Sequence, residues 1–304
     1  MGAPSYVFRE IDHCGMCSAP SSSSRILGLR LNQSQGLNPR RKSGVAITVH
    51  RCTMCDLVYS NPEPLPARLN EHYDIPVESY WNEGQLSASI DIFSRPFSKA
   101  KELLKFEPGM RALDVGTGTG LGFIALRQAG FDAWAMEPSP SFRAKALELT
   151  KASEERIALT SIEEAEYPEN TFDFVTFGSV FEHLYNPSRA LERSMNFLRP
   201  GGIWYADVPS ANWLNAKMIN AYFKLIGTSF VTNLSPMHSP FHIHEYTHNT
   251  FEKYAQRTGL FEVVSYRYEV CPVRSFPRML HPLFHKIMER TDTGLQLHVW
   301  LRRL

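Results

Sequence analysis

The chain has 304 residues, 43% of them hydrophobic and 12% aromatic, which is enough for one substantial core and a small accessory module. Its 32 basic and 31 acidic residues give a formal net charge of +1, unlike the strongly basic balance of a nucleic-acid binder. No apolar run reaches the ~18 residues of a membrane helix, and charged residues interrupt the amino terminus. We therefore expect a cytoplasmic globular protein with no membrane span.

Two C-x-x-C pairs are the first motif along the chain, Cys14 with Cys17 and Cys52 with Cys55. Each pair can form a tight turn that presents two thiolates to one metal ion, and two such turns complete a tetrahedral zinc site. The residues between the pairs include few large apolar side chains, so a metal would supply stability that they lack. Two disulfides or a redox dithiol are the competing interpretations. The duplicated motif and the expected reducing compartment favour zinc.

The same region is positively charged. Between His13 and Cys55 there are six basic residues and no Asp or Glu. Cations near a four-thiolate zinc centre would offset its net charge of about minus two, so the charge need not bind a partner. The alternative is an anionic partner such as RNA or a nucleotide-linked substrate.

A glycine-rich segment, RALDVGTGTG at 111–120, lies in the middle of the chain. A short apolar run that ends at Asp114, three alternate glycines and an amphipathic stretch from Leu121 predict a strand, a loop and a helix. Glycine permits tight backbone angles and close approach to a ligand, and the helix amino terminus points free N–H groups at it. A second predicted strand, 132–136, ends in Glu137, which is placed to accept hydrogen bonds from a ribose diol. The pair indicates a nucleoside-bearing cofactor.

The details of the loop favour S-adenosylmethionine over a dinucleotide. The dinucleotide fingerprint G-x-G-x-x-G needs a third glycine where this chain has Leu121 or Phe123. Asp114 would repel a pyrophosphate but suits a positively charged amino acid group. The alternative is an ordinary glycine turn without a ligand.

The rest of the central region alternates predicted strands with predicted helices. Further strands are expected at 156–161, 172–177 and 198–209. This rhythm predicts a Rossmann-like, doubly wound α/β sheet, whose ligands gather at the carboxyl ends of its strands. The expected cofactor-binding residues are Asp114, Gly116, Thr117, Gly118, Gly120, Glu137, Pro138, Ser161, Ile162, Gly178 and Ser179.

The motif LDVGTGTG, with Glu137 and the segments 172–187 and 197–209, resembles class I S-adenosylmethionine-dependent methyltransferases. The resemblance covers about Tyr80 to Leu304. It implies that the glycine motif and the acid after the second strand hold the cofactor. We expect a zinc-ribbon-like module at 1–78 and a methyltransferase domain at 79–304.

The sequence around the second C-x-x-C pair, 50–74, resembles the amino-terminal zinc-binding segment of many bacterial methyltransferases. These enzymes act on nucleotide-linked sugars, polysaccharide precursors or natural products, which implies a small-molecule acceptor. Asp56 is a departure, because such a turn commonly has glycine there. A second departure concerns the separate carboxy-terminal domain of the longer sugar C-methyltransferases, which we do not recognise here.

A long connection, 209–245, follows the predicted fifth strand. Its apolar residues recur at helical spacing between Trp213 and Ile226. They predict either a helix packed on the sheet or a cap over the acceptor.

Four histidines lie within eleven residues, at 238, 242, 244 and 248. Metal binding is one interpretation, but with their spacing and an expected helix start at Thr247 or Asn249 the four imidazoles need not converge. In the family that this segment resembles, a histidine lies at the rim of the acceptor site, and His244 matches it best. His183, just beyond the fourth strand, is the other candidate.

The expected reaction is an in-line transfer of the sulfonium methyl group to a small molecule. Loss of the acceptor's proton calls for a general base. The candidate catalytic residues are His244 and His183, with Glu182 and Glu245 next. The alternatives are an RNA or protein methyltransferase that uses the basic module, and a non-catalytic protein that binds S-adenosylmethionine.

Overall fold

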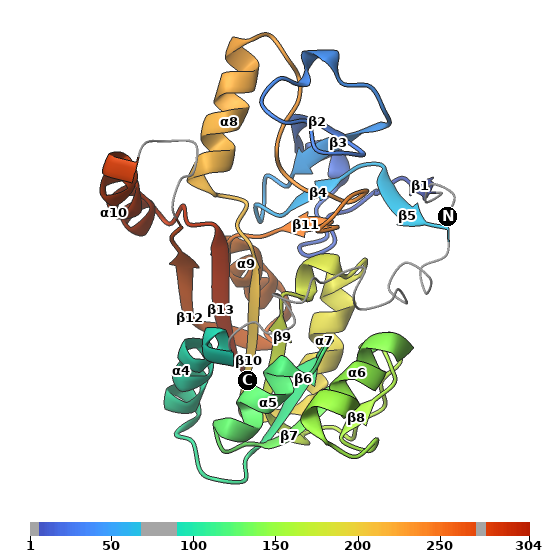
Figure 1. Ribbon diagram of the computed structural model, residues 1–304, viewed down its shortest axis with the longest axis vertical. Helices are drawn as coiled ribbons and strands as arrows, with labels where there is room; N and C mark the ends of the chain where they lie inside the picture. The colour runs from blue at the N-terminus through green and yellow to red at the C-terminus, as the bar shows by residue number, and fades with distance from the viewer. Residues whose placement is uncertain (1–5, 68–89, 272–277) are drawn as a thin grey trace.

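A seven-stranded sheet forms the lower half of the molecule in the computed structural model, which describes residues 6–67, 90–271 and 278–304 (Figure 1). Five strands run parallel, and β13 pairs antiparallel with β10 and with β12. The doubly wound α/β sheet expected from the sequence is confirmed. The strands, in their order across the sheet, are β12 (Phe261–Glu269), β13 (Gln296–Arg303), β10 (Leu198–Pro209), β9 (Phe172–Gly178), β6 (Arg111–Val115), β7 (Asp132–Met136) and β8 (Ile157–Ala158).

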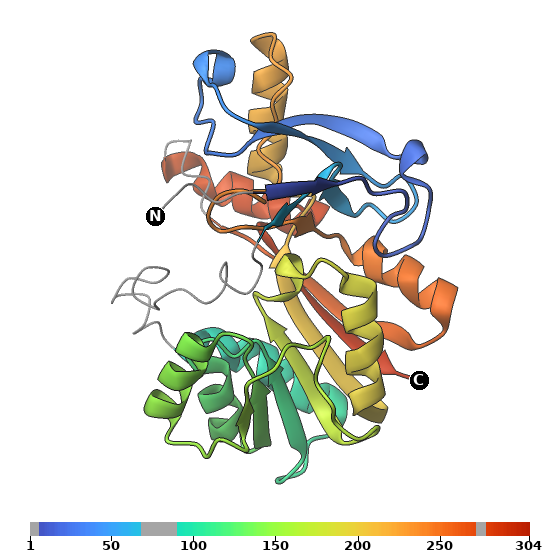
Figure 2. The same ribbon diagram turned by 90° about the vertical axis from the view of Figure 1, so that its right-hand side faces the viewer.

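Helices cover both faces of this sheet (Figure 2). Successive side chains of a strand point to opposite faces, so Phe174 and Val175 of β9 belong to two different cores. One core packs Phe174 against helices α4 (Ser94–Leu104), α5 (Leu121–Gln128) and α6 (Pro140–Thr150). The other packs Val175 with α7 (Pro187–Phe197) and α9 (His248–Thr258). The sheet is therefore buried on both sides, as a parallel sheet requires.

Hydroxyl side chains cap the starts of two helices. Ser139 accepts a hydrogen bond from the backbone N–H of Phe142 at the start of α6. Thr247 and Thr250 form a capping box at the start of α9, which confirms the Thr247 alternative. Gly259 ends α9 in the left-handed conformation that glycine favours.

The amino-terminal module is a four-stranded antiparallel sheet above the carboxyl end of β10 (Figure 1). Three strands come from the first 60 residues. The fourth, β11, comes from much later in the sequence and pairs with β4. The expected domain boundary at residues 78 and 79 lies outside the described residues. The module's strands are β2 (Arg25–Leu31), β3 (Ala46–Arg51), β4 (Val58–Ser60) and β11 (His244–Glu245), and beside them β1 (Tyr6–Arg9) pairs with β5 (Glu63–Pro66).

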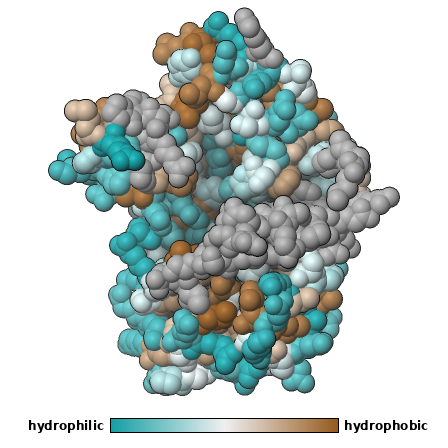
Figure 3. All heavy atoms as spheres, viewed as in Figure 1, coloured by the Kyte–Doolittle hydropathy of each residue, from teal (hydrophilic) through white to brown (hydrophobic). Residues whose placement is uncertain are grey.

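The long connection after β10 joins the same module. Its helix α8 (Leu214–Leu225) is close to the predicted range, and the segment after it pairs with β2, where Leu29 N–H donates to the Ser229 carbonyl at 2.8 Å. Val231 packs in a small core with Val49 and other module residues. The free end of α8 is apolar (Figure 3), and Leu225 is 86% exposed. The connection thus completes the module and does not lie flat on the large sheet.

The remaining elements are α10 (His281–Thr291) and five short 3-10 helices, η1 (Ser21–Ser23), η2 (Pro39–Arg41), η3 (Ile90–Phe93), η4 (Phe181–His183) and η5 (Arg278–Leu280). No helix within the described ranges combines the length and the apolar character needed to cross a membrane.

Candidate functional site

The glycine loop follows β6, and its three glycines are needed for two different reasons. Gly116, Gly118 and Gly120 all have positive φ angles, of 67°, 56° and 90°. A Cβ on Gly120 would lie 2.5 Å from the Thr150 side chain, and one on Gly116 would lie 2.8 Å from Val180. A Cβ on Gly118 would have no heavy atom of the described residues within 4 Å, apart from its chain neighbours. Two glycines therefore allow packing, and Gly118 leaves bare backbone open to a ligand.

Asp114 lies buried directly below this loop. Its Oδ2 accepts a hydrogen bond from the Thr117 hydroxyl at 2.7 Å. A Cβ on Gly122 would come within 2.5 Å of the same carboxylate, so glycine in the first turn of α5 lets Asp114 approach the helix. Burial, with a smaller contribution from the charges of Glu137 and Asp207, raises the pKa of Asp114 to about 7, although the Thr117 hydroxyl opposes the shift. Gly122 was not among the predicted site residues, although a glycine inside a helix is unfavourable and usually has a packing reason.

Glu137 joins the end of β7 to the glycine loop. Its carboxylate accepts from the Gly118 N–H at 2.8 Å and from the Ser139 N–H at 3.0 Å. Burial raises the pKa of Glu137, and both backbone donors oppose that shift. A carboxylate has about four lone-pair positions, so each oxygen can still accept from a ligand hydroxyl. Pro138, beside it, is exposed.

The other expected cofactor residues lie at the ends of neighbouring strands. Ile162 is buried, and Ser161 is half-buried. Gly178 ends β9 opposite the Phe93 ring, which a Cβ would approach to 3.3 Å. Ser179 is exposed, with a positive φ of 53°.

Asp207 fixes this strained position of Ser179. The backbone N–H and the hydroxyl of Ser179 donate to its carboxylate at 3.1 and 3.0 Å. Burial raises the pKa of Asp207, and the charge of His298 lowers it. Asp207 was not among the predicted site residues, although a carboxylate near the end of an apolar strand was a signal.

Beyond Ser179, the short helix η4 carries Glu182 and His183. His242 comes from the long connection and lies opposite them, with Nε2 at 3.7 Å from the Glu182 Oε1 atom. The rings of His183 and His242 have centroids 5.2 Å apart. Burial, together with a smaller effect of His183, lowers the pKa of His242 to about 3. His183 was a predicted catalytic residue, whereas His242 was predicted only as one of four histidines that could bind a metal.

His244, the other predicted base, is not part of this group. It lies in β11, only 4% exposed, and its Nδ1 atom has no hydrogen-bond partner among the described residues. Burial lowers the pKa of His244 to about 4, and a hydrogen bond with the backbone of Leu184 opposes this shift. Glu245 beside it is held by Asn233 and by the Leu234 N–H. His244 is therefore an interior residue between the module and the large sheet.

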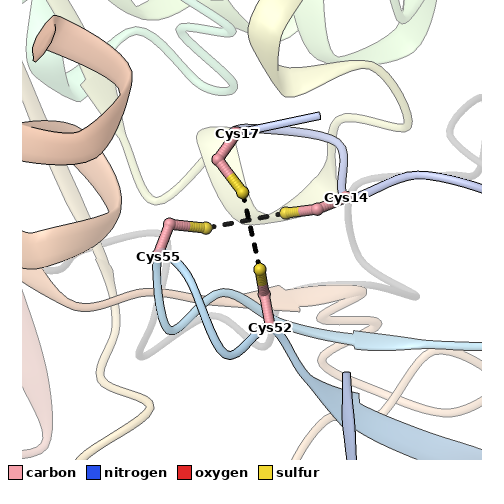
Figure 4. A group of neighbouring side chains, drawn as sticks. All are labelled: Cys14, Cys17, Cys52 and Cys55. Carbon is pink, nitrogen blue, oxygen red and sulfur yellow. Dashed lines mark hydrogen bonds between the residues drawn. The ribbon is translucent and has the colours of Figure 1, made fainter. Parts of the chain in front are cut away.

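The four paired cysteines converge on one point (Figure 4). The Sγ atoms of Cys14 and Cys55 are 3.6 Å apart, and those of Cys17 and Cys52 are 3.5 Å apart. The Cys14 thiol lowers the pKa of Cys17 to about 7, and the neighbouring thiols also lower the pKa of Cys52. Tetrahedral zinc with Zn–S bonds of about 2.3 Å places sulfurs about 3.8 Å apart, close to these separations.

The second turn keeps its shape despite the departure at Asp56. This residue has a positive φ of 65°, the conformation for which glycine is common. Its carboxylate accepts from Arg51 at 3.0 Å and from the Asn249 amide at 3.0 Å. The Thr250 hydroxyl donates to the Cys55 carbonyl at 2.8 Å. These contacts hold the turn against α9.

Residues 90–266, more than half of the chain, match the family model described as "Methyltransferase domain". The chain belongs to this family. The match covers the methyltransferase domain from η3 to β12, which includes the glycine loop, Glu137 and the residues of η4.

Curated relatives of the methyltransferase domain are named ubiquinone biosynthesis O-methyltransferase. The protein of Bradyrhizobium diazoefficiens is 27% identical over 150 residues, which are 48% of this chain and 56% of the relative. That of Nitrobacter winogradskyi is 30% identical over 129 residues, 40% of this chain and 48% of the relative. The chain thus spans about half the length of the curated relatives it matches. Among solved structures, an S-adenosylmethionine-dependent methyltransferase from Mesorhizobium loti is 14% identical, with a TM-score of 0.49 over 71% of this chain and all of that one.

Proposed function

We propose that this methyltransferase domain transfers the methyl group of S-adenosylmethionine to a hydroxyl group of a small molecule. The observation that carries the proposal is the pair of buried carboxylates, Asp114 and Glu137, on either side of the open backbone at Gly118. Asp114 suits the ammonium of the donor, and Glu137 suits its ribose. When bound, the donor supplies an electrophilic methyl group, so the protein has to orient the acceptor and remove its proton.

A small molecule fits the module better than RNA. Arg30 and Arg51, two of its six basic residues, are engaged inside the protein. Arg30 is 8% exposed and donates to the Leu234 carbonyl at 2.8 Å. Arg51 donates to Asp56 and to Asn212. Fewer cations therefore remain for phosphates. The acceptor classes that we propose are nucleotide-linked sugars, polysaccharide precursors and natural products, and the relatives' names support oxygen as the methylated atom.

His183 is the better of the two candidate bases. It follows the end of β9, and its side chain is 17% exposed, whereas His244 is enclosed. Since a base must reach the acceptor and then release its proton, we assign that function to His183 and a structural position to His244. The segment 209–245 would limit the acceptor site from above.

We also propose that Cys14, Cys17, Cys52 and Cys55 hold one structural zinc ion. Three of the thiols are buried, and their sulfur separations fit tetrahedral coordination. The ion would hold the two turns against η4 and α9 and take no part in methyl transfer.

Calorimetric titration of the purified protein with S-adenosylmethionine tests the donor site. We expect saturable binding that weakens at least tenfold in Asp114→Asn and in Glu137→Gln, because each loses a charged partner of the ligand. Asp132→Asn is the matched control, since Asp132 begins the strand that ends before Glu137 but pairs with Arg156 at 2.6 Å. Equal binding in all four proteins would refute the donor assignment.

The acceptor is tested by mass spectrometry after incubation with S-adenosylmethionine and separate mixtures of nucleotide sugars, phenolic natural products and total RNA. We expect a methyl increment in one of the small-molecule mixtures. An increment in RNA alone would favour the alternative in which the basic module grips a nucleic acid.

A further inference from the structure

Three side chains from two distant parts of the chain meet at the carboxyl end of β9. One ligand atom from each of Glu182, His183 and His242 lies within 4.8 Å of the other two. The Glu182 Oε1 atom is 3.7 Å from Nε2 of His242 and 4.0 Å from Nε2 of His183. The Ile243 N–H donates to the Glu182 carbonyl at 3.2 Å, so the backbone fixes the two segments together.

One oxygen of the buried Glu182 carboxylate lacks a hydrogen-bond donor among the described residues. The residue is 1% exposed, and its Oε2 atom has no hydrogen-bond partner among the described residues. The negative charge of Asp207 also acts on it. A buried charge without a counter-charge is costly, and groups of this kind are ordinarily paired or bound to a metal ion. A cation between Glu182 and the two imidazoles would satisfy the carboxylate.

The histidines are arranged as metal ligands. Nδ1 of His183 lies 3.2 Å from the Phe241 carbonyl, and that contact leaves Nε2 facing Glu182. Metal-binding histidines commonly use their second nitrogen in this way, because a carbonyl partner fixes the ring and its tautomer. The side chains of His183 and His242 are 17% and 28% exposed, whereas that of Glu182 is 2% exposed. The open side of the cluster therefore faces away from the core.

We propose that Glu182, His183 and His242 bind one divalent transition-metal ion, and that the open coordination positions take the hydroxyl oxygen of the acceptor. Two imidazole nitrogens and one carboxylate oxygen suit Mn²⁺, Fe²⁺, Co²⁺ or Zn²⁺. The site is next to the donor loop, since Val180 contacts the position of Gly116. The metal site deepens and rests on the proposed function, and it makes His183 a ligand in place of a direct base.

The ion would promote the same step by a different route. A bound divalent cation lowers the pKa of a coordinated hydroxyl, whose proton leaves to solvent. The oxygen then attacks the methyl carbon, the carbon–sulfur bond breaks and its electron pair stays on sulfur. The products are the methyl ether and S-adenosylhomocysteine.

Mn²⁺ is the probe, because it prefers nitrogen and oxygen ligands to the thiolates of the cysteine cluster. Electron paramagnetic resonance of free Mn²⁺ should give about one bound ion per chain in protein that holds a single equivalent of zinc, which the four thiolates bind ahead of the Glu182 cluster. We expect affinity to fall about 10- to 100-fold in Glu182→Gln and His242→Gln. His248→Gln, a histidine that stacks on Tyr266, is the control and should bind as the unchanged protein does. Absence of Mn²⁺ binding, or equal binding in Glu182→Gln, would overturn the site.

A thermal melt shows whether the variants are folded. Mn²⁺ should raise the melting temperature of the unchanged protein and leave that of Glu182→Gln where it was. Without metal, Glu182→Gln should melt no lower than the unchanged protein, because the substitution removes a buried charge. An Mn²⁺-induced shift of equal size in Glu182→Gln would contradict the assignment.

Failure of the metal site and failure of the proposed function are distinguishable. Titration of metal-free Glu182→Gln with S-adenosylmethionine should show normal donor binding. If methyl transfer to an identified acceptor proceeds at an unchanged rate in Glu182→Gln and His242→Gln, the metal inference fails and the proposed function stands. Mn²⁺ binding with no donor binding would support the site and refute the function.

Discussion

The donor edge of the large sheet and the amino-terminal module are built in opposite ways. The donor edge comes from one short stretch, in which Asp114, the glycine loop and Glu137 lie within 24 residues, supported by buried cores on both sheet faces. The module draws its fourth strand, β11, from distant chain, since His244 pairs with Tyr59, and it brings four thiols together beside a small core. The first region therefore depends on local sequence and packing, whereas the second depends on distant chain and, in our proposal, on a bound ion.

Removal of a cysteine ligand should break this comparison most strongly. Cys52→Ala is expected to lower zinc content from about one ion per chain to well under one and to cost several kcal/mol of module stability. Metal analysis and limited proteolysis after the substitution measure both effects. Cys271→Ala is the control, because the fifth cysteine lies outside the cluster and should change neither. Full zinc content in Cys52→Ala would refute the four-cysteine site.

Substitution of two glycines separates packing from ligand binding at the donor edge. Gly120→Ala forces a side chain into a positive φ and against Thr150, so we expect a loss of about 2–5 kcal/mol in denaturant unfolding. Gly118→Ala meets no side chain within the part of the chain that the structure describes, and should cost only the left-handed strain, about 1–2 kcal/mol. Donor affinity should nevertheless fall more in Gly118→Ala, because its new methyl group occupies the ligand side. Unimpaired donor binding by Gly118→Ala would show that the ligand does not approach there.

The pH dependence of donor binding gives the smallest expected effect. Burial raises the pKa of Asp114 to about 7, so the carboxyl group is largely neutral at pH 6 and cannot pair with an ammonium. Apparent affinity for S-adenosylmethionine should weaken roughly tenfold per pH unit below about 7 and level off above it. Asp114→Asn should lose most of this dependence. The folded state of the unchanged protein holds the Asp114 proton more tightly than the unfolded chain does, so its free energy of unfolding should fall as pH rises from 4 to 7. The free energy of unfolding of Asp114→Asn should fall less over the same range.

The sequence predicted the regular parts of the large sheet closely. Strand β7 has the predicted bounds, and Thr247 caps α9 as one of two stated alternatives. These features depend on short-range periodicity and on local hydrogen bonds. The position of the long connection was less accessible, because its helical spacing describes α8 equally well beside the large sheet or beside the module.

The residues of the candidate site also fall into those that the sequence predicted and those that it did not. Asp114, Glu137 and the cysteine pairs were recognisable because each stands in or beside a motif of residue types at fixed short spacing. Asp207 and His242 belong to no such motif, and only folding brings them to their partners, Ser179 and Glu182, which are 28 and 60 residues away. His244 was predicted because its segment resembles that of the family, and its burial in the structure makes it a poorer candidate base than His183.

The sequence by itself determined the doubly wound sheet, the glycine loop with its two carboxylates, and two cysteine turns able to share an ion. Each of these depends on residue type at fixed short spacing, which the chain carries wherever it folds. The tertiary structure decided that β11 completes the module, that α8 stands with the module, and that His242 faces Glu182 while His244 turns into the core. Such pairings require long loops to close and alternate side chains of one extended segment to face opposite ways, and no local pattern specifies the surface that each face meets.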